Sequence, residues 1–245
     1  MVRLEEREFE ELVINSEYDV AVPVEVFLYE DERGLEIVTY SFTQKVAREF
    51  EEKFASDPFS REARDFLYAK LTPIMDEFEY SSLQSAERSF IEFRRDASAP
   101  RAEYPGCEII SALEGEEWDE LPLDEFALDP DDPTDRMAAV KEDGKIVCFA
   151  GLNDEIDGDG IAEITVECDP AYRGLGYATA CVVTLANYLE SLGKRVKYIC
   201  RDTNEASIKT AKKAGLVPYC RFMPYVCRKK NPDGTENEEL TFDEV

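Results

Sequence analysis

Histidine is absent from the 245 residues of the sequence. This absence excludes His-based catalytic triads, imidazole general bases and most catalytic zinc sites. Any general base must therefore be a carboxylate, a phenol, a thiolate, an amine or a water molecule. Long apolar runs are also missing and the first residues are charged. We therefore expect no membrane contact, no secretory leader and a cytoplasmic location.

Basic residues are scarce relative to acidic ones. The chain has 28 Lys and Arg against 55 Asp and Glu, which gives a formal net charge of −27. Proteins that bind a nucleic-acid backbone carry a basic patch, so this balance argues against a nucleic-acid partner. An anionic surface instead favours solubility and attracts cations.

Glycine, proline and paired cysteine motifs are few. Only 12 Gly and 12 Pro interrupt a chain that is 44% hydrophobic, which predicts one large or two small domains with a substantial core. The seven cysteines include no CxxC pair, and four of them lie in apolar, strand-like segments. We therefore expect reduced thiols and no metal site.

The first 100 residues predict a mixed α+β region. Apolar residues alternate along 20–29, a turn follows, and 35–40 reads as a second strand, so we expect a hairpin. Helical apolar spacing predicts three helices: one beginning at Ser41 or Thr43, one over 63–78 and one over 82–95. Their apolar stripes are typical of core packing, and a groove for a partner is the alternative.

The rest of the chain shows a mostly β pattern with two helices. Strands are expected over 108–113, 137–141, 145–152, 161–168 and 196–200, and helices over 178–189 and 208–214. Residues 114–135 carry 11 acidic side chains and no basic one. The predicted division is an N-terminal region of residues 1–100, a domain of residues 101–230 and an acidic tail of residues 231–245.

The most informative segment is residues 169–180, where a strand enters a turn with two glycines that opens a helix. Such a turn directs successive backbone N–H groups into one concavity, and the helix N-terminus adds partial positive charge. Gly174 and Gly176 permit backbone angles and a close approach that a Cβ would hinder. The segment therefore predicts a pyrophosphate cradle, although it lacks the Lys-Ser/Thr of a P-loop and the third Gly of a dinucleotide fingerprint.

Several motifs in order resemble the GNAT superfamily of acyl-coenzyme-A-dependent N-acyltransferases. Arg173-Gly174-Leu175-Gly176-Tyr177-Ala178 is similar to that family's Gln/Arg-x-x-Gly-x-Gly/Ala motif. Ala162-Glu163-Ile164 with Asp169-Pro170 resembles its central strand and exit. Asn204, Ser207 and Lys213-Ala214-Gly215-Leu216 resemble its Asn-x-x-Ser and terminal Gly-Phe/Leu elements.

The resemblance implies an α/β fold: a mixed, mostly antiparallel sheet whose two central strands, 161–168 and 196–200, splay apart and are flanked by helices. Acetyl-CoA would enter between them as co-substrate. The resemblance implies that the backbone of the strand end pairs with the pantetheine, that the turn binds the pyrophosphate and that the start of the next helix contacts the cofactor's arm. The residues are Val166, Glu167, Cys168, Arg173, Gly174, Leu175, Gly176, Tyr177, Ala178, Thr179, Asn204 and Ser207.

The resemblance also implies direct attack by an amine on the thioester in a ternary complex. Glu163 occupies the strand position at which relatives carry a Glu base, and Glu167 shares its face by alternation. The alternative for Glu163 is a hydrogen-bonding role within the sheet. Relatives often place an acid Tyr where this chain has Ala211, so the usual proton donor is missing.

The acceptor is expected to be a small-molecule or peptide amine. The acidic segment 114–135 favours a cationic one, unless it is only a solvated face. Two other hypotheses remain: a degenerate module that binds CoA as a sensor or partner-binding protein, and a scaffold whose N-terminal region binds a partner. Relatives often dimerise, so a homodimer is a further expectation.

Overall fold

The computed structural model describes residues 1–5, 13–15, 20–82, 89–95, 104–113, 121, 128–153, 156, 158–231 and 233–235. The chain forms two compact units, residues 1–91 with 220–245 and residues 92–219. The predicted division at residues 100 and 230 follows chain order, whereas the observed units do not. The difference arises because the last long strand begins in the second unit and continues into the first.

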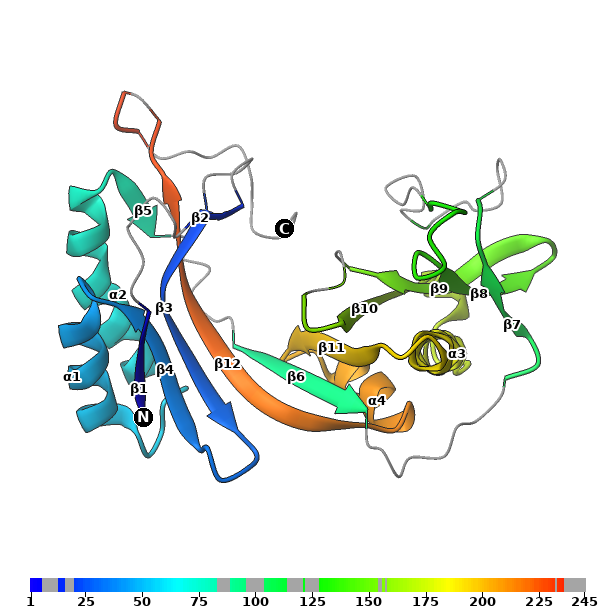
Figure 1. Cartoon of the computed structure of the whole chain (residues 1–245), viewed down its shortest axis with the longest axis horizontal. Helices are drawn as coiled ribbons and strands as arrows, with labels where there is room; N and C mark the ends of the chain where they lie inside the picture. The colour runs from blue at the N-terminus through cyan, green and yellow to red at the C-terminus, as the bar shows by residue number, and fades with distance from the viewer. Residues whose placement is uncertain are drawn as a thin grey trace. The chain divides into compact units, whose positions relative to one another are not determined.

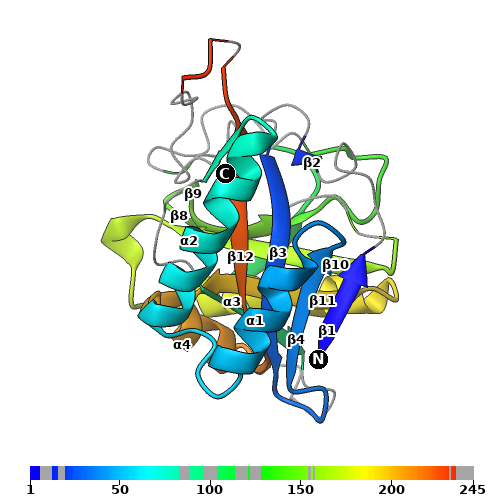
Figure 2. The same ribbon diagram turned by 90° about the vertical axis from the view of Figure 1, so that its left-hand side faces the viewer.

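The first unit is a sheet with two helices on one face, as Figures 1 and 2 show. The strand order is β1-β4-β3-β12, with β2 paired to β3 and β5 to β12. Only the β1–β4 pair is parallel among the pairs described in this unit. The elements are β1 (Val2–Glu5), β2 (Val13–Asn15), β3 (Val20–Tyr29), β4 (Leu35–Tyr40), α1 (Gln44–Phe54), α2 (Arg61–Glu77), β5 (Tyr80–Ser82) and most of β12 (Leu216–Lys229).

The apolar stripes of the two predicted helices form the core of this unit. Phe50 of α1 and Leu71 of α2 are fully buried and belong to one cluster with Val26 and Ile37 of the hairpin. The core interpretation of these stripes is therefore confirmed. Thr43 precedes α1 as predicted, but its hydroxyl donates to the carbonyl oxygen of Pro23 (3.1 Å) and makes no cap hydrogen bond.

The helix predicted over 82–95 is wrong over its described C-terminal half. Phe90–Arg95 forms strand β6, and residues 83–88 lie outside the described part of the chain. Phe90 stacks on Phe222 (ring centroids 5.3 Å apart), and the Arg94 guanidinium lies 3.7 Å from the centre of the Tyr219 ring. These contacts come from β12, so tertiary pairing overrides a helical spacing read from local sequence.

The second unit holds the other sheet segment, with strand order β6-β11-β10-β9-β8-β7. The β10–β11 pair is parallel, whereas β9–β10, β8–β9 and β7–β8 are antiparallel. The fold class is confirmed as a mixed, mostly antiparallel sheet with flanking helices. The elements are β6, β7 (Cys107–Ile110), β8 (Met137–Glu142), β9 (Lys145–Leu152), β10 (Ile161–Cys168), a 3-10 turn (Pro170–Tyr172), α3 (Tyr177–Ser191), β11 (Arg195–Arg201) and α4 (Glu205–Lys213).

Helix α3 anchors this unit because it packs against strands β7 to β11. Its buried residues include Val182, Leu185 and Leu189, which recur at helical spacing. Gly193 follows the helix with φ +78°, the left-handed conformation typical of a helix end. The predicted helix stripe and its glycine terminator are therefore both confirmed.

We expect Leu189→Ala to lower the free energy of unfolding by about 2–5 kcal/mol, because it empties a fully buried site in the α3 packing layer. The matched control is Leu192→Ala, one position past the same helix, where the side chain is 39% exposed. We expect that change to stay within about 0.5 kcal/mol of the wild type. Urea denaturation measures both, and equal losses would contradict this assignment of the core.

Candidate functional site

The central parallel strands β10 and β11 pair over three residues and then separate. The register joins Ile161 to Arg195, Ala162 to Val196 and Glu163 to Lys197. From residue 164 onward β10 keeps its other neighbour, β9, through to Cys168. The predicted splay is therefore present, and it begins directly after Glu163.

The open edge of β10 presents backbone groups of Val166 and Cys168. Asn153 N donates to Glu163 O (2.9 Å) and Asp169 N donates to Val147 O (2.9 Å), both towards β9. Backbone groups alternate sides along a strand, so those of residues 164, 166 and 168 are directed to the opposite edge. At that edge Arg173 Nε donates to Cys168 O (3.1 Å), so the carbonyl is within reach of a hydrogen-bond donor.

The turn after β10 is shaped by an aspartate and two glycines. Asp169 Oδ1 accepts from Ala171 N (2.7 Å) and closes the 3-10 turn. Gly174 and Gly176 have φ of +82° and +91°, and a Cβ on either would meet no atom within 4 Å. The two glycines therefore allow the positive φ angles of the turn and leave open space in front of the α3 N-terminus. The first N–H groups of α3 lack intrahelical acceptors and are available to a ligand there.

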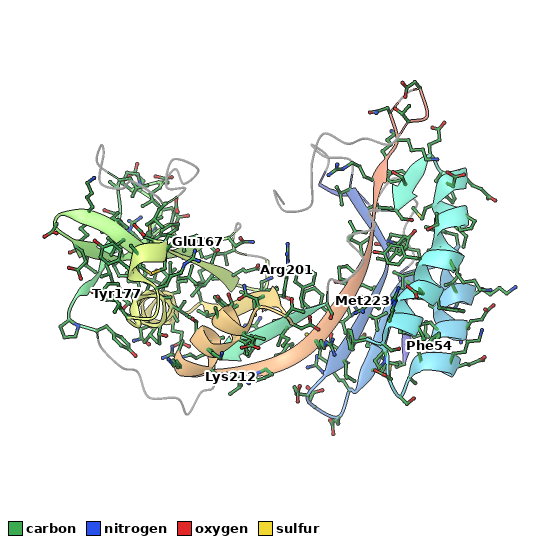
Figure 3. The ribbon with its side chains drawn as sticks, turned by 180° about the vertical axis from the view of Figure 1, so that it is seen from behind. Phe54, Glu167, Tyr177, Arg201, Lys212 and Met223 are labelled. Atoms are coloured by element: carbon green, nitrogen blue, oxygen red, sulfur yellow. The ribbon has the colours of Figure 1, made fainter. Side chains whose placement is uncertain are left out.

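Helix α4 begins at the mouth of the splay. Asn204 is its N-cap, and its side-chain oxygen accepts from Ser207 N (3.1 Å). The predicted pair is thus joined by a capping hydrogen bond, which fixes the direction of the first turn. Figure 3 shows Lys212 on this helix, Tyr177 at the start of α3 and Glu167 on β10.

These elements enclose a pocket of about 500 Å³, within the usual size range of small-molecule sites. It brings together every predicted cofactor-binding residue except Leu175, whose side chain is 61% exposed in the turn. The lining residues are Val166, Glu167, Cys168, Tyr172, Arg173, Gly174, Gly176, Tyr177, Ala178, Thr179, Tyr198, Asn204, Ala206, Ser207, Lys209, Thr210 and Lys213.

The sequence analysis did not identify Tyr172 of the 3-10 turn or the residues that α4 and β11 contribute to the pocket wall. Residues 206, 210 and 213 share one face of α4 by helical spacing, which could have been extended from the cap. No sequence pattern placed Tyr198 in the pocket wall, because its position depends on which face of β11 is turned towards the pocket. The missed residues are Tyr172, Tyr198, Ala206, Lys209, Thr210 and Lys213.

The two predicted carboxylates have different surroundings. Glu163 is outside the pocket lining, forms an ion pair with Lys197 (Oε2 to Nζ, 3.1 Å) and accepts from Asn153 Nδ2 (3.2 Å). Glu167 lines the pocket. Partial burial raises the pKa of the Glu167 carboxyl, and the Arg173 guanidinium offsets part of that shift. The geometry thus favours the sheet-bonding alternative for Glu163 and brings Glu167 to the site.

The pocket holds a phenol that does not come from α4. Ala211, at the position expected for an acid Tyr, is fully buried and does not line the pocket. Tyr198 reaches the pocket from β11 and is 3% exposed. Burial raises the pKa of its hydroxyl, so Tyr198 stays protonated at neutral pH.

Charges in the lining favour an anionic ligand. The pocket lining holds three cationic side chains, those of Arg173, Lys209 and Lys213, and one carboxylate, that of Glu167. This balance is the opposite of that of the whole chain, which is strongly acidic. Among the described residues, no group of three or more metal-ligating side chains could hold a metal ion. Over the same residues, no helix is long and apolar enough to cross a membrane.

A comparison with protein families decides what kind of domain carries this pocket. Residues 101–216 match the model of the acetyltransferase (GNAT) family. These residues form a GNAT acetyltransferase domain. The matched segment contains the splayed strands, the glycine turn and the whole pocket lining. The family resemblance expected from the sequence is confirmed.

Solved GNAT structures resemble the chain distantly. A GNAT-family protein from Novosphingobium aromaticivorans DSM 12444 shares 16% identity over 62% of this chain and 69% of its own, with a TM-score of 0.47. An acetyltransferase from Colwellia psychrerythraea shares 14% identity over 62% of this chain and 64% of its own, with a TM-score of 0.43. A GCN5-related N-acetyltransferase from Sphaerobacter thermophilus shares 17% identity over 66% of this chain and 58% of its own, with a TM-score of 0.41. The chain thus spans less than two thirds of the last two, and no curated protein matches its sequence.

Proposed function

We propose that this protein transfers an acetyl group from acetyl-CoA to an amine nitrogen by direct attack in a ternary complex. The observation that carries the proposal is the separation of β10 from β11 after Glu163, which opens a strand edge beside the glycine turn. GNAT acetyltransferases use acetyl-CoA as acetyl donor. The proposal assigns that role to this chain's own pocket.

The pocket residues fit the chemistry of that donor. Its pyrophosphate is an anion, and the N–H groups at the start of α3, with Arg173 and Lys213 nearby, supply donors and positive charge. Its pantetheine arm carries amides, and the backbone of Val166 and Cys168 offers strand-like partners at the open edge. The thioester would then lie deeper in the splay, near Glu167 and Tyr198.

The proposed reaction assigns one role to each reactive group. Glu167 removes a proton from the amine, directly or through water, and the nitrogen forms a bond to the acetyl carbon. The N–H of Val166 donates to the carbonyl oxygen as charge develops there. The carbon–sulfur bond breaks and the departing thiolate takes a proton from the Tyr198 hydroxyl. Bringing the two substrates together supplies much of the rate.

Gly176→Asp tests the pocket. We expect it to lower acetyl-CoA affinity by about a hundredfold or more, because its carboxylate faces the pyrophosphate and like-charge contacts cost several kcal/mol. The matched control is Gly193→Asp at the other end of α3, which also has positive φ and open space around its Cα. Isothermal titration measures both proteins. Equal affinities in the two variants, or no binding by the wild type, would overturn the proposed donor site.

Glu167→Gln tests the base. We expect kcat to fall about a hundredfold or more. In the wild type the rate rises with pH as Glu167 loses its proton, at a pH above the ordinary carboxyl pKa because burial raises it. The groups that modulate this titration are Arg173, Cys148 and Tyr198. This rise of the rate with pH is the acidic limb of the pH–rate profile, and we expect the Glu167→Gln variant to lose it.

Glu163→Gln is the matched control, since Glu163 is the other carboxylate on the same strand face and is already paired with Lys197. It should keep the acidic limb. Tyr198→Phe should lower kcat and leave that limb in place, because it removes the proton donor and not the base. An acidic limb that disappears in Glu163→Gln and persists in Glu167→Gln would reverse the assignment.

We also propose that the acceptor is a cationic amine, on the basis of the net charge of −27. Residues 114–120 and 122–127 of the acidic segment lie outside the described residues. In its described part, Asp129, Asp132 and Asp135 accept hydrogen bonds from backbone N–H groups of their own turn. Those three carboxylates therefore also shape the turn.

Salt dependence tests the acceptor charge. At saturating acetyl-CoA, kcat/KM for a diamine should fall as ionic strength rises, because salt screens attraction between separated charges. A neutral hydroxylated amine analogue of similar size serves as the control and should show no such fall. Parallel salt curves for the two acceptors would reject a cationic preference and leave the acetyl transfer itself standing.

A further inference from the structure

Four cysteines from four different elements meet beside the pocket. Cys107 Sγ of β7 lies 3.8 Å from Cys181 Sγ of α3. Cys181 Sγ donates to the carbonyl oxygen of Cys148 of β9 (3.5 Å), and Cys148 is the cross-strand partner of Cys168 of β10. All four are free thiols, and of these four only Cys168 belongs to the pocket lining. The four residues therefore form a cysteine cluster that reaches from the pocket wall into the core.

The strand register places Cys148 directly opposite Cys168. The two are Cα partners in the antiparallel β9–β10 pair. Backbone hydrogen bonds link residue 163 to 153 and residue 169 to 147, so the hydrogen-bonded pairs are the odd-numbered positions of β10. Cys168 and Cys148 therefore form a non-hydrogen-bonded pair, whose Cα atoms lie about 4.5 Å apart in regular sheets.

That geometry suits a disulfide. Disulfides span Cα separations of about 4.4–6.8 Å, and side chains in non-hydrogen-bonded pairs lie on the same face and close together. The two residues are directly opposite each other in the strand pairing. A bond between the two sulfur atoms is therefore compatible with the observed strand pairing.

The two sulfur atoms are not equivalent. Hydrogen bonding between the two thiols lowers the pKa of Cys148 and raises the pKa of Cys168, and Cys181 Sγ donates to the carbonyl oxygen of Cys148 (3.5 Å). Cys148 is fully buried, whereas Cys168 is partly exposed at the pocket. Cys168 is therefore the sulfur that a molecule in the pocket can reach, and Cys148 is the thiol behind it in the core.

We propose that Cys168 and Cys148 form a redox-active dithiol that reacts with small disulfides entering the pocket. Cys168 loses its thiol proton to water in the pocket and attacks one sulfur of the disulfide R–S–S–R. A Cys168–S–S–R bond forms as the R–S–S–R bond breaks, and one R–S⁻ leaves and takes up a proton. Cys148 then loses its own thiol proton and attacks the sulfur of Cys168, a Cys148–Cys168 disulfide forms, and the second R–S⁻ leaves and takes up a proton. Two protein thiols are oxidised, one disulfide is reduced, and the two thiol protons end on two R–SH molecules.

The experiment treats the full chain with glutathione disulfide, blocks the remaining thiols by alkylation and maps peptides by mass spectrometry. Trypsin releases residues 146–173 as one peptide, because no Lys or Arg lies between Lys145 and Arg173. This peptide contains only the two cysteines of the pair. We expect it unalkylated and lighter by two hydrogen atoms. A Glu-specific protease then cuts between the cysteines, and the two fragments that carry them separate only on reduction.

Single variants distinguish the two roles. Cys148→Ser should accumulate glutathione on Cys168, because the resolving thiol is missing, whereas Cys168→Ser should carry none on Cys148. The matched control is Cys200→Ser, a buried position of β11 outside the pocket lining, which should still form the disulfide. Both cysteines of peptide 146–173 recovered alkylated, a Cys107–Cys181 disulfide in their place, or no glutathione adduct in Cys148→Ser would overturn the proposal.

A second arm adds acetyl-CoA before the oxidant. If acetyl-CoA occupies the pocket, it shields Cys168 and slows formation of the disulfide. Formation at an unchanged rate would count against the proposed donor site and would leave the dithiol intact. Oxidation by the disulfide of CoA, compared with glutathione disulfide, shows which small disulfide the pocket accepts faster.

Discussion

The separation of β10 from β11 after three paired residues is the constraint from which the site follows. A sheet satisfies backbone hydrogen bonds on both edges of an inner strand, and a buried unpaired amide or carbonyl is costly. By releasing β11 at Glu163, the fold leaves the groups of Val166 and Cys168 without a strand partner on that side. Arg173 partly meets this need by donating to Cys168 O. An extended ligand with its own amides meets it more completely.

The release is possible because other contacts hold β10 in place. Its inward residues Ala162 and Ile164 are buried under α3, and β9 pairs with it through to Cys168. The strand therefore needs no second neighbour at its C-terminal half to remain ordered. The glycine turn then reverses the chain so that α3 starts beside the same open edge. The strand edge and the helix N-terminus therefore lie next to each other and present their backbone groups to the same pocket.

The sequence predicted those parts of the site that depend on local backbone chemistry. Gly174, Gly176 and the Asn204 cap could be recognised because a positive φ or a capping oxygen leaves a signature within a few residues. Tyr198 could not, since only the packing of β11 brings it to the pocket wall. The helix expected over 82–95 failed for the same reason: the spacing of its apolar residues is local, whereas the partners of Phe90 and Arg94 lie on β12, more than 100 residues later. The cross-strand position of Cys148 and Cys168 likewise depends on register, which spacing alone does not set.

The charge of the chain and the charge of its pocket have opposite signs, and distance decides which one a ligand experiences. At physiological ionic strength the screening length is about 8 Å, so carboxylates far from the site act weakly on a bound anion. Arg173, Lys213 and the α3 N-terminus line the pocket itself and are not screened in this way. An anionic donor can therefore bind within a protein of net charge −27. The same reasoning applies to the acceptor. The whole acidic surface attracts a cationic amine only while the amine approaches. At the thioester, only carboxylates within the screening length act on the amine, and Glu167 is the carboxylate in the pocket lining. The residue that would select the amine is then also the residue that would deprotonate it.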